Sequence, residues 1–284
     1  MKLNNFIKRA LTGILFVALL VGGILYNPLS FALLFALVAG LAVNEFAVLI
    51  NNSGRAVINR SISVVAGVYL FFAVFGFSNG ISGAEIFVPY LLTLIYLLIA
   101  ELYLRQPDPV SDWAYTMMSQ LYVALPFALL NVLYCYPIEV VGGDSVSVAT
   151  SPILPLSLFI FLWASDSGAY MVGSLIGKHR LFERISPKKS WEGSIGGGVL
   201  AVLAAWCLWY FFPIMPLWQW IGMALVVVVF GTWGDLVESL MKRQLGIKDS
   251  GNILPGHGGI LDRFDSSMLA IPAVVVYLYT LSLI

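Results

Sequence analysis

Long apolar segments constrain the fold of this chain more than any other feature of its sequence. Runs of roughly 17–25 residues recur along it, and a helix of this length crosses the hydrocarbon core of a bilayer. Because no water there can pair with backbone amides and carbonyls, each crossing segment must be helical. The sequence predicts an all-α polytopic membrane protein with about nine transmembrane helices. We expect them at 10–26, 29–50, 62–79, 86–104, 114–136, 152–177, 194–212, 216–232 and 267–283.

Composition favours the same class of protein. The chain has 284 residues, of which 60% are hydrophobic and 11% are charged. Ordinary soluble domains carry about 25% charged residues, so this shortage of charge argues against a soluble enzyme of the same length. We therefore treat the lipid bilayer as a partner, and we expect no nucleic-acid partner.

The placement of lysine and arginine predicts the orientation of the chain. If the N-terminus is cytoplasmic and nine spans follow, all 15 Lys and Arg residues fall on the inner side. The outer segments hold only acids, at Glu85, Glu139 and Asp144. This asymmetry follows the positive-inside rule, so we expect a cytoplasmic N-terminus and a C-terminus outside. The inner segments are then 1–9, 51–61, 105–113, 178–193 and 233–266.

Polar residues are distributed unevenly between the two halves of the sequence. We expect N-terminal transmembrane helices in residues 1–136, which carry few polar groups inside their spans. Residues 152–284 hold the polar clusters, so we expect a catalytic transmembrane region there. Its two cytoplasmic loops are predicted at 178–193 and 233–266.

The richest polar segment is 231–266, which contains five acids and four bases. Asp235, Glu238, Ser239 and Lys242 share one face if the preceding helix continues into the cytoplasm. Asp262 and Asp265 lie three residues apart at the start of the last span. Carboxylates suit Mg²⁺ and cationic side chains suit phosphate, so the pattern indicates a site for metal and phosphate together. The alternative is a solvated loop whose charges only follow the positive-inside rule.

Glycines and polar residues fill the stretch between these two groups of acids. Lys248 and Asp249 precede His257 and Gly258. Glycine lets the backbone approach a ligand closely, so the stretch is a candidate binding loop. A lone histidine is usually structural or exposed, but here its neighbours make a ligand contact reasonable.

A second cluster lies in 178–193, where Lys188 and Lys189 stand between Ser186 and Ser190. Basic and hydroxyl groups close to the start of a helix suit phosphate. The alternative is a topology signal that also attracts anionic lipid headgroups.

Carboxylates inside apolar spans form the third feature. Asp166 lies near the middle of the sixth span, with Tyr170 on the same face. A charge at that depth costs roughly 2.5–3.5 kcal/mol, which makes it a functional candidate. The alternative is a hydrogen bond to a neighbouring helix. Glu45 in the second span has the same two interpretations, and structural pairing is at least as good an explanation for it.

Together these residues resemble the signature of the phosphatidate cytidylyltransferase (CDP-diacylglycerol synthase) family. That signature runs S-x-x-K-R, K-D, P-G-H-G-G and D-R-x-D. This chain has Ser239-Leu240-Met241-Lys242-Arg243, Lys248-Asp249, Pro255-Gly256-His257-Gly258-Gly259 and Asp262-Arg263-Phe264-Asp265 in that order. Gly234-Asp235-Leu236, Asp166-Ser167-Gly168-Ala169-Tyr170 and the segment from Ser186 to Gly193 also resemble family elements. The resemblance covers about 160–270.

The resemblance implies a nucleotidyltransferase of phospholipid biosynthesis that converts CTP and phosphatidate to CDP-diacylglycerol and diphosphate. It also implies a Mg²⁺-dependent, multi-pass enzyme of the inner (cytoplasmic) membrane that forms a homodimer. Such enzymes are similar in holding Mg²⁺ on two aspartates, which map to Asp235 and Asp262. A second cation is also compatible with the resemblance.

The residue types suit this chemistry. A phosphate monoester is already anionic, so catalysis is a matter of positioning and charge neutralisation. The catalytic candidates are Asp235, Asp262, Lys189, Asp265 and Lys242. The substrate-binding candidates are Ser186, Lys188, Ser190, Ser239, Arg243, Lys248, Asp249, His257, Gly258, Arg263, Asp166 and Tyr170.

Two other classes of protein remain open at this stage. One is a different membrane-embedded phosphotransferase that acts on a lipid substrate, although the D-G-x-x-A-R motif of CDP-alcohol phosphotransferases is absent. The other is an ion-coupled transporter that uses Asp166 and Glu45. Transporters usually contain internal repeats and concentrate polar groups at the midplane, and neither feature is evident here.

Overall fold

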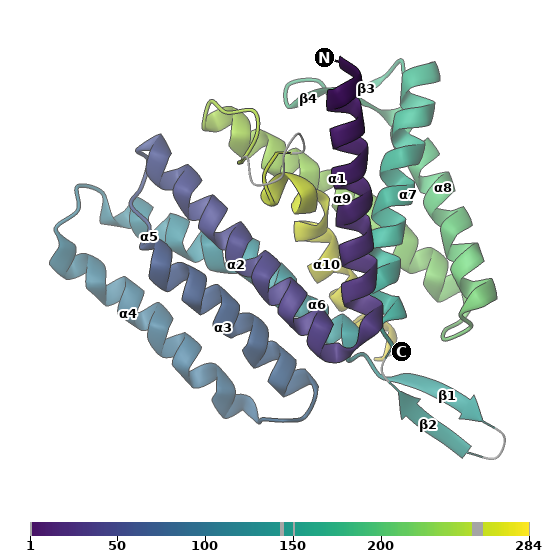
Figure 1. Ribbon diagram of the computed structural model, residues 1–284, viewed down its shortest axis with the longest axis horizontal. Coiled ribbons are helices and arrows are strands. Elements are labelled where there is room, and N and C mark those ends of the chain that lie inside the picture. Colours follow the sequence, from purple (N-terminus) through teal and green to yellow (C-terminus); the bar gives the residue numbers. More distant parts are fainter. Residues whose placement is uncertain (1, 143–144, 150, 252–257, 284) are drawn as a thin grey trace. The chain divides into compact units, whose positions relative to one another are not determined.

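A computed structural model describes residues 2–142, 145–149, 151–251 and 258–283 of the chain (Figure 1). Within these residues, eight helical segments are long and apolar enough to cross a membrane. The first helix, α1 (Lys2–Tyr26), adds a shorter apolar stretch at Leu11–Tyr26. The prediction of an all-α polytopic membrane fold is confirmed, whereas the orientation of the termini stays a prediction.

The described chain forms two compact units, and each is built from two stretches of sequence. The first unit comprises residues 1–132 and 245–264, and the second comprises 133–244 and 265–284. The elements that begin within residues 1–132 are α1, α2 (Pro28–Ser53), α3 (Arg60–Ser78), η1 (Ala84–Phe87), α4 (Val88–Leu104), α5 (Pro109–Met118), the π-helical segment η2 (Ser119–Ala124) and α6 (Leu125–Tyr134).

Small residues and buried amides hold the first unit together. A Cβ added at Gly67 of α3 would lie 3.1 Å from both Ala124 and Val43, so this glycine sets a close approach of α3 to α2 and η2. The Gln120 side chain in η2 donates to the carbonyl of Ser63 at 3.0 Å. In an apolar environment such a bond satisfies groups that have no water available.

The second unit contains the remaining long helices and two short hairpins. The helices are α7 (Ile153–Ile176), α8 (Trp191–Phe211), α9 (Leu217–Gln244) and α10 (Leu261–Leu281), whose first residues belong to the first unit. One hairpin pairs β1 (Ile138–Gly142) with β2 (Ser145–Ala149), and the other pairs β3 (Arg180–Phe182) with β4 (Ser186–Ser190). The sequence did not predict either hairpin.

Glycines also set the spacing between α7 and α8. A Cβ at Gly168 would lie 2.7 Å from the carbonyl oxygen of Gly196, and one at Gly197 would lie 2.6 Å from that of Ser165. Small residues at such positions let transmembrane helices pack backbone to backbone, where dispersion and weak polar contacts replace the hydrophobic effect. This packing fixes the start of α8, and β4 leads directly into it.

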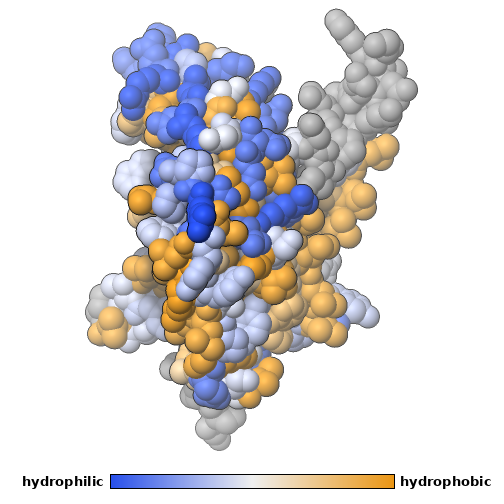
Figure 2. Space-filling view, turned by 90° about the vertical axis from the view of Figure 1, so that its left-hand side faces the viewer, coloured by the Kyte–Doolittle hydropathy of each residue, from blue (hydrophilic) through white to orange (hydrophobic). Residues whose placement is uncertain are grey.

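The surface carries the large apolar side chains that a soluble protein would bury. In the span formed by η1 and α4, only 11% of the most apolar stretch is buried, and Leu91, Leu92 and Leu102 are exposed. Figure 2 shows broad hydrophobic areas on the face it presents. Exposed apolar surface on this scale fits helices whose outer faces contact lipid.

Candidate active site

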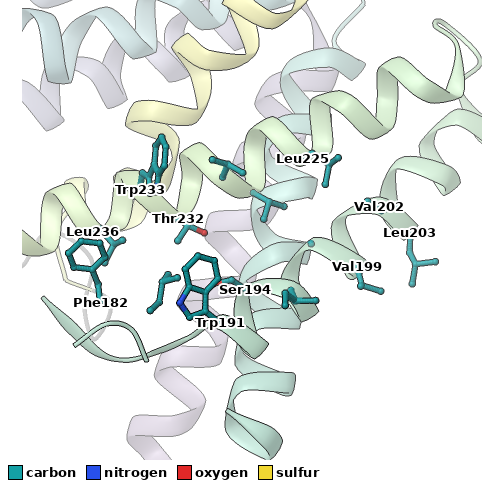
Figure 3. A pocket seen from close by; sticks show the side chains of 15 residues that line it. Phe182, Trp191, Ser194, Val199, Val202, Leu203, Leu225, Thr232, Trp233 and Leu236 are labelled. Carbon is teal, nitrogen blue, oxygen red and sulfur yellow. The ribbon is translucent and has the colours of Figure 1, made fainter. Parts of the chain in front are cut away.

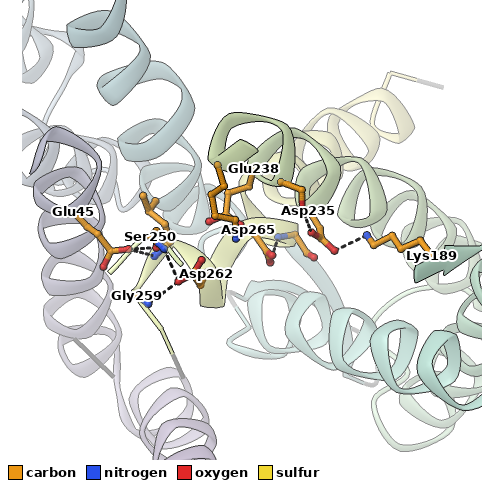
Figure 4. Close-up of polar contacts among 12 residues, drawn as sticks. Glu45, Lys189, Asp235, Glu238, Ser250, Gly259, Asp262 and Asp265 are labelled. Carbon is orange, nitrogen blue, oxygen red and sulfur yellow. Dashed lines mark hydrogen bonds and ion pairs between the residues drawn. The ribbon is translucent and has the colours of Figure 1, made fainter. Parts of the chain in front are cut away.

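Lys189 and Asp235 form an ion pair in the second unit. Lys189 is the last residue but one of β4, and its Nζ lies 2.6 Å from Oδ2 of Asp235 on α9. The same Nζ donates to the carbonyl of Thr232 at 3.4 Å, and Ser239 donates to Oδ1 of Asp235 at 3.0 Å. Both oxygens of Asp235 are therefore engaged (Figure 4). The predicted shared face of Asp235 and Ser239 is confirmed.

Further carboxylates lie beside this pair. Glu238 on α9 is 2% exposed and pairs with Lys242 at 2.8 Å. Asp265 on α10 interacts electrostatically with Asp235, Glu238 and Lys242. A Cβ at Gly234 would lie 2.6 Å from the backbone oxygen of Asp265, so a glycine at this position lets α10 approach α9. Three acids and two lysines thus share one region of the second unit.

Sequence reasoning placed Glu238 on one helical face with Asp235, Ser239 and Lys242, but it did not include Glu238 among the candidate site residues. The spacing that placed it there is the signal for its role. Glu238 lies three residues after Asp235 and four before Lys242, which places all three on one helical face.

A cavity of about 410 Å³ with several charged residues in its lining lies next to the ion pair. Asp166 and Tyr170 of α7 line it, as do Lys188, Lys189 and Ser190 of β4. The structure therefore brings together residues from two of the predicted clusters, and it adds Arg180 and Thr232. Ser186 lies at the far end of β4, opposite Phe182.

Ser190 has a structural task at the start of α8. Its side chain accepts a hydrogen bond from the backbone N–H of Gly193 at 3.1 Å, and the residue is 3% exposed. Helix N-termini leave backbone donors without intrahelical partners, and a serine cap satisfies one of them. The predicted substrate contact of Ser190 therefore competes with a cap that the structure shows.

Glu45 organises a second polar cluster, in the first unit (Figure 4). This α2 residue is 5% exposed. Its carboxylate accepts from the backbone N–H groups of Ile260 at 2.8 Å and Leu261 at 3.1 Å, and also from the hydroxyl of Ser250. The donors surround the first residue of α10, so Glu45 supplies the cap for this helix from another element.

Asp262 lies in the first turn of α10, directly after this cap. Its Oδ2 accepts from the backbone N–H groups of Ser250 at 2.9 Å and Gly259 at 2.8 Å. Glu45 and Asp262 thus hold the same loop, because both bind Ser250. The loop is fixed by two carboxylates that take backbone donors which would otherwise be buried without partners.

Glycines make these carboxylate contacts sterically accessible. A Cβ at Gly259 would lie 2.0 Å from Oε1 of Glu45, and one at Gly251 would lie 2.8 Å from Oε2. Gly258 has φ 84°, and a Cβ there would lie 2.5 Å from Oδ2 of Asp262. The sequence predicted that these glycines let the backbone approach a ligand, which stays a prediction, and the structure shows that they approach the carboxylates of Glu45 and Asp262.

Several predicted binding residues lie outside these contacts. Arg243, Lys248, Asp249 and Arg263 are exposed. His257 lies outside the residues that the structure describes. Asp235 belongs to one compact unit and Asp262 to the other, so their joint binding of one metal ion stays a prediction.

The carboxylates fit the chemistry of a magnesium ion. Mg²⁺ prefers oxygen ligands, commonly one or two carboxylates together with phosphates and water. Asp235 already has a cationic partner at 2.6 Å, and two other acids stand close to it, so this region favours positive charge. Across the described ranges, no set of three or more His, Cys, Asp or Glu side chains is arranged to enclose a metal by itself.

Taken together, these features define a multi-pass α-helical membrane protein with acidic and basic groups clustered at the ends of its helices. The chain belongs to the cytidylyltransferase family, whose family model matches residues 7–281.

Curated relatives agree with this family. The chain is 40% identical over 168 residues to a phosphatidate cytidylyltransferase of Staphylococcus aureus (strain COL), and the matched stretch covers 59% of each chain. It is 36% identical over 203 residues to a phosphatidate cytidylyltransferase of Staphylococcus haemolyticus, covering 65% of this chain and 78% of the relative. A Staphylococcus epidermidis phosphatidate cytidylyltransferase matches at 40% over 168 residues. The matched part thus spans 59% of the length of the S. aureus and S. epidermidis relatives.

Proposed function

We propose that this protein transfers a cytidylyl group from CTP to phosphatidate and so forms CDP-diacylglycerol and diphosphate. The observation that carries the proposal is the pair of Lys189 and Asp235 at 2.6 Å, beside a cavity lined by three basic residues, Arg180, Lys188 and Lys189. This arrangement provides cationic groups for phosphate oxygens next to carboxylates suited to metal. Membership of the cytidylyltransferase family and the names of the relatives support it.

The reaction balances without a proton acceptor in the protein. An anionic phosphate oxygen of phosphatidate attacks the α-phosphorus of CTP. A new P–O bond forms, the bond from the α-phosphorus to the bridging oxygen breaks, and diphosphate leaves with its electron pair. The obstacle is repulsion between anionic reactants, so the protein must hold them together and neutralise charge.

Lys189 is the residue best placed to change partners during this reaction. Its side chain is 26% exposed and bonded to Asp235, so it reaches the cavity without a large desolvation cost. We propose that it moves from the carboxylate to a phosphate of the nucleotide when CTP enters. Lys188, exposed on the same strand, adds positive charge for a second phosphate.

We further propose that magnesium takes part and that Asp235 and Asp262 hold it. A bound Mg²⁺ would neutralise phosphate charge on CTP and on the leaving diphosphate. The chain's own contribution is to hold these carboxylates in place. Ser239 orients Asp235, and the backbone N–H groups of Ser250 and Gly259 orient Asp262.

The cellular setting is also part of the proposal. Because CTP is a cytoplasmic nucleotide, Lys189 and Asp235 must face the cytoplasm, as the positive-inside rule predicts. We propose the inner (cytoplasmic) membrane as the location, with phosphatidate supplied from that bilayer, and a homodimer as the assembly.

The contacts of Glu45 weaken the transporter alternative. Both of its carboxylate oxygens accept hydrogen bonds, from Ser250, Ile260 and Leu261. A carboxylate that caps a helix in this way has a structural reason to lie inside an apolar helix, so ion coupling is not needed to explain it.

The decisive test is an assay of the detergent-purified protein with labelled CTP, phosphatidate and Mg²⁺. We expect labelled CDP-diacylglycerol, one diphosphate released for each product, and no turnover when EDTA removes the metal. Labelled product from another lipid acceptor but none from phosphatidate would reject the proposal in favour of a different phosphotransferase.

A further inference from the structure

A long apolar groove runs between α8 and α9 in the second unit, and the site described above does not include it. Its volume is about 760 Å³ (Figure 3). Its walls are almost entirely hydrocarbon, with Trp191, Val199 and Leu203 from α8 and Leu225 and Trp233 from α9. Such a groove takes a flexible apolar ligand and offers little to a nucleotide.

Near one end, this groove meets the cationic cavity, the cavity of about 410 Å³ that Arg180, Lys188 and Lys189 line. Ser194 and Thr232 line both the groove and the cavity. The carbonyl of Thr232 also accepts a hydrogen bond from Lys189, so the junction lies at the proposed phosphate site. A ligand that fills both spaces must have an anionic head and an apolar tail, because the cavity is basic and the groove is not.

The groove leads away from this junction along the helices. Ser194 and Leu203 are both on α8, and a rise of 1.5 Å per residue separates them by about 14 Å. Thr232 lies on α9 at the junction end, and Leu225 lies about 10 Å from it along that helix. In Figure 3, Thr232 lies close to Trp191, and Leu225 lies toward the end marked by Val202 and Leu203.

We propose that this groove holds one acyl chain of the phospholipid whose phosphate occupies the cationic cavity. The inference rests on the proposed function, and it assigns a place on this chain to the tail of the lipid substrate. The hydrophobic effect supplies little affinity, because the tail leaves one apolar environment for another. Affinity comes instead from close packing of the tail against the groove walls, and a tail fixed along α8 also orients the phosphate at the junction toward Lys189.

Gly198 provides a clean way to narrow the groove. It lines the groove on α8, and among the described residues nothing lies within 4 Å of a Cβ built there. A leucine at this position therefore extends into the groove without moving the backbone. Gly22 on α1 is a matched control, because it is exposed and its Cβ also meets no described atom within 4 Å.

The first experiment compares Gly198→Leu with Gly22→Leu on a series of phosphatidates, from dihexanoyl to dioleoyl. We expect Gly198→Leu to raise KM for the dioleoyl lipid about tenfold, through the loss of roughly ten dispersion contacts. KM for CTP, and KM for the dihexanoyl lipid, should stay close to wild type. Gly22→Leu should change none of these values. An equal loss on short and long chains, or no loss on either, overturns the proposal.

A second variant tests the direction of the groove. Leu203→Trp narrows the end remote from Ser194. We expect its KM to rise only for chains longer than those that Gly198→Leu already impairs. The same onset length for both variants would show that the tail does not run along α8, and the assignment would be wrong.

Binding without turnover separates this inference from the proposed function. Phosphatidate with a diazirine at the end of its acyl chain should cross-link to groove residues of α8 or α9 in the wild-type protein, and Gly198→Leu should suppress that adduct. The adduct should form even in protein that makes no CDP-diacylglycerol, so failure of catalysis leaves this result readable. Two results would overturn the proposal. Adducts spread over all helices would assign the groove to bulk lipid. If Gly198→Leu converts a dimer to a monomer without any change in cross-linking, the groove binds a second copy of the chain.

Discussion

Asp235 and Asp262 are held by different kinds of partner, and this difference sets how each responds to substitution. Asp235 binds a lysine and a hydroxyl, whereas Asp262 binds two backbone amides. An asparagine keeps an oxygen that can accept the amides of Ser250 and Gly259. At position 235, an asparagine keeps the hydrogen bond from Ser239 but loses the charge pair with Lys189.

We therefore expect Asp235→Asn and Asp262→Asn to fold normally and to lose turnover by far more than about tenfold, as when a metal ligand or its support is lost. Loss of the partly exposed ion pair between Asp235 and Lys189 should lower the free energy of unfolding by only about 1 kcal/mol or less. Thermal unfolding and turnover at saturating Mg²⁺ measure the two effects. A variant that keeps more than a tenth of wild-type turnover would remove that aspartate from the metal site.

Lys189 is expected to act on the nucleotide more than on the lipid. Replacing it with alanine removes a charge-assisted phosphate contact worth about 1.5–3 kcal/mol, so kcat/KM for CTP should fall by more than the KM for phosphatidate rises. Arg184→Ala is the matched control, because Arg184 is an exposed base between β3 and β4 that lines neither cavity. If Lys189→Ala and Arg184→Ala change kcat/KM for CTP equally, the segment 178–193 acts only as a topology signal.

Glu45 is expected to be a positioning residue for the loop that carries Asp262. Glu45→Ala leaves the amides of Ile260 and Leu261 without their acceptor, and loss of such outer support costs about 10–100-fold in metal affinity or activity. Glu45→Gln keeps one acceptor oxygen, so its activity should lie between that of Glu45→Ala and that of the wild-type protein. Asn44→Ala, which removes a contact with exposed Arg60, is the control.

The readout for Glu45 is the Mg²⁺ concentration that gives half-maximal rate, measured beside thermal unfolding. A purely structural role would lower stability and leave that concentration unchanged. We expect it to rise for Glu45→Ala and less for Glu45→Gln.

At the scale of elements, the apolar runs of the sequence placed the helices, and polar caps decided where they begin. The last apolar run was expected from 267, with Asp262 and Asp265 in the first turn of its helix. The helix begins at Leu261, where Glu45 caps its amides from α2. The helix expected from 194 begins at Trp191, because Ser190 caps it. The Glu45 cap joins residues more than two hundred positions apart, so hydropathy alone could not reveal it.

The same lesson applies to the candidate site. Asp235 and Ser239 were predicted to share a face because helical spacing is local, and the structure confirms it. The pair of Lys189 with Asp235 depends on how β4 and α9 pack, which the spacing of residues does not encode. Motif resemblance selected Lys189 and Asp235 individually, but only the fold gives their contact.

Ser190 allows the cap and the predicted phosphate contact to be separated. Ser190→Ala should lower the free energy of unfolding by about 1 kcal/mol, the usual cost of a lost N-cap, whereas Ser190→Asn should restore it. Chemical or thermal unfolding measures this difference. If Ser190→Ala and the wild-type protein have the same free energy of unfolding, the cap contributes nothing to stability. Activity that stays low in Ser190→Asn, despite restored stability, would show that the hydroxyl also binds substrate.

At the scale of the whole molecule, the two compact units interleave in sequence. The first needs residues 245–264 from late in the chain, and this segment includes the loop that Glu45 and Asp262 hold. Residues 1–136 alone therefore lack part of their own unit. We expect the full chain to be required for folding as well as for activity.

The orientation in the membrane is the last prediction, and it also belongs to the whole molecule. Single cysteines at Glu183, after β3, and at Gln244, the end of α9, replace exposed residues that the positive-inside rule places in the cytoplasm. Asn79, exposed at the end of α3, is expected on the other side. The background lacks Cys135 and Cys207, the free cysteines of the described chain.

An impermeant thiol reagent should label the cysteines at 183 and 244 in inverted vesicles of the expression host and not in intact spheroplasts. The cysteine at 79 should show the opposite pattern. The two inner positions lie on either side of the segment from β4 through α9, so they must agree if an even number of spans separates them. Labelling of either one from outside would reverse the predicted topology, and Lys189 and Asp235 would then face away from the cytoplasmic CTP that the proposed reaction consumes.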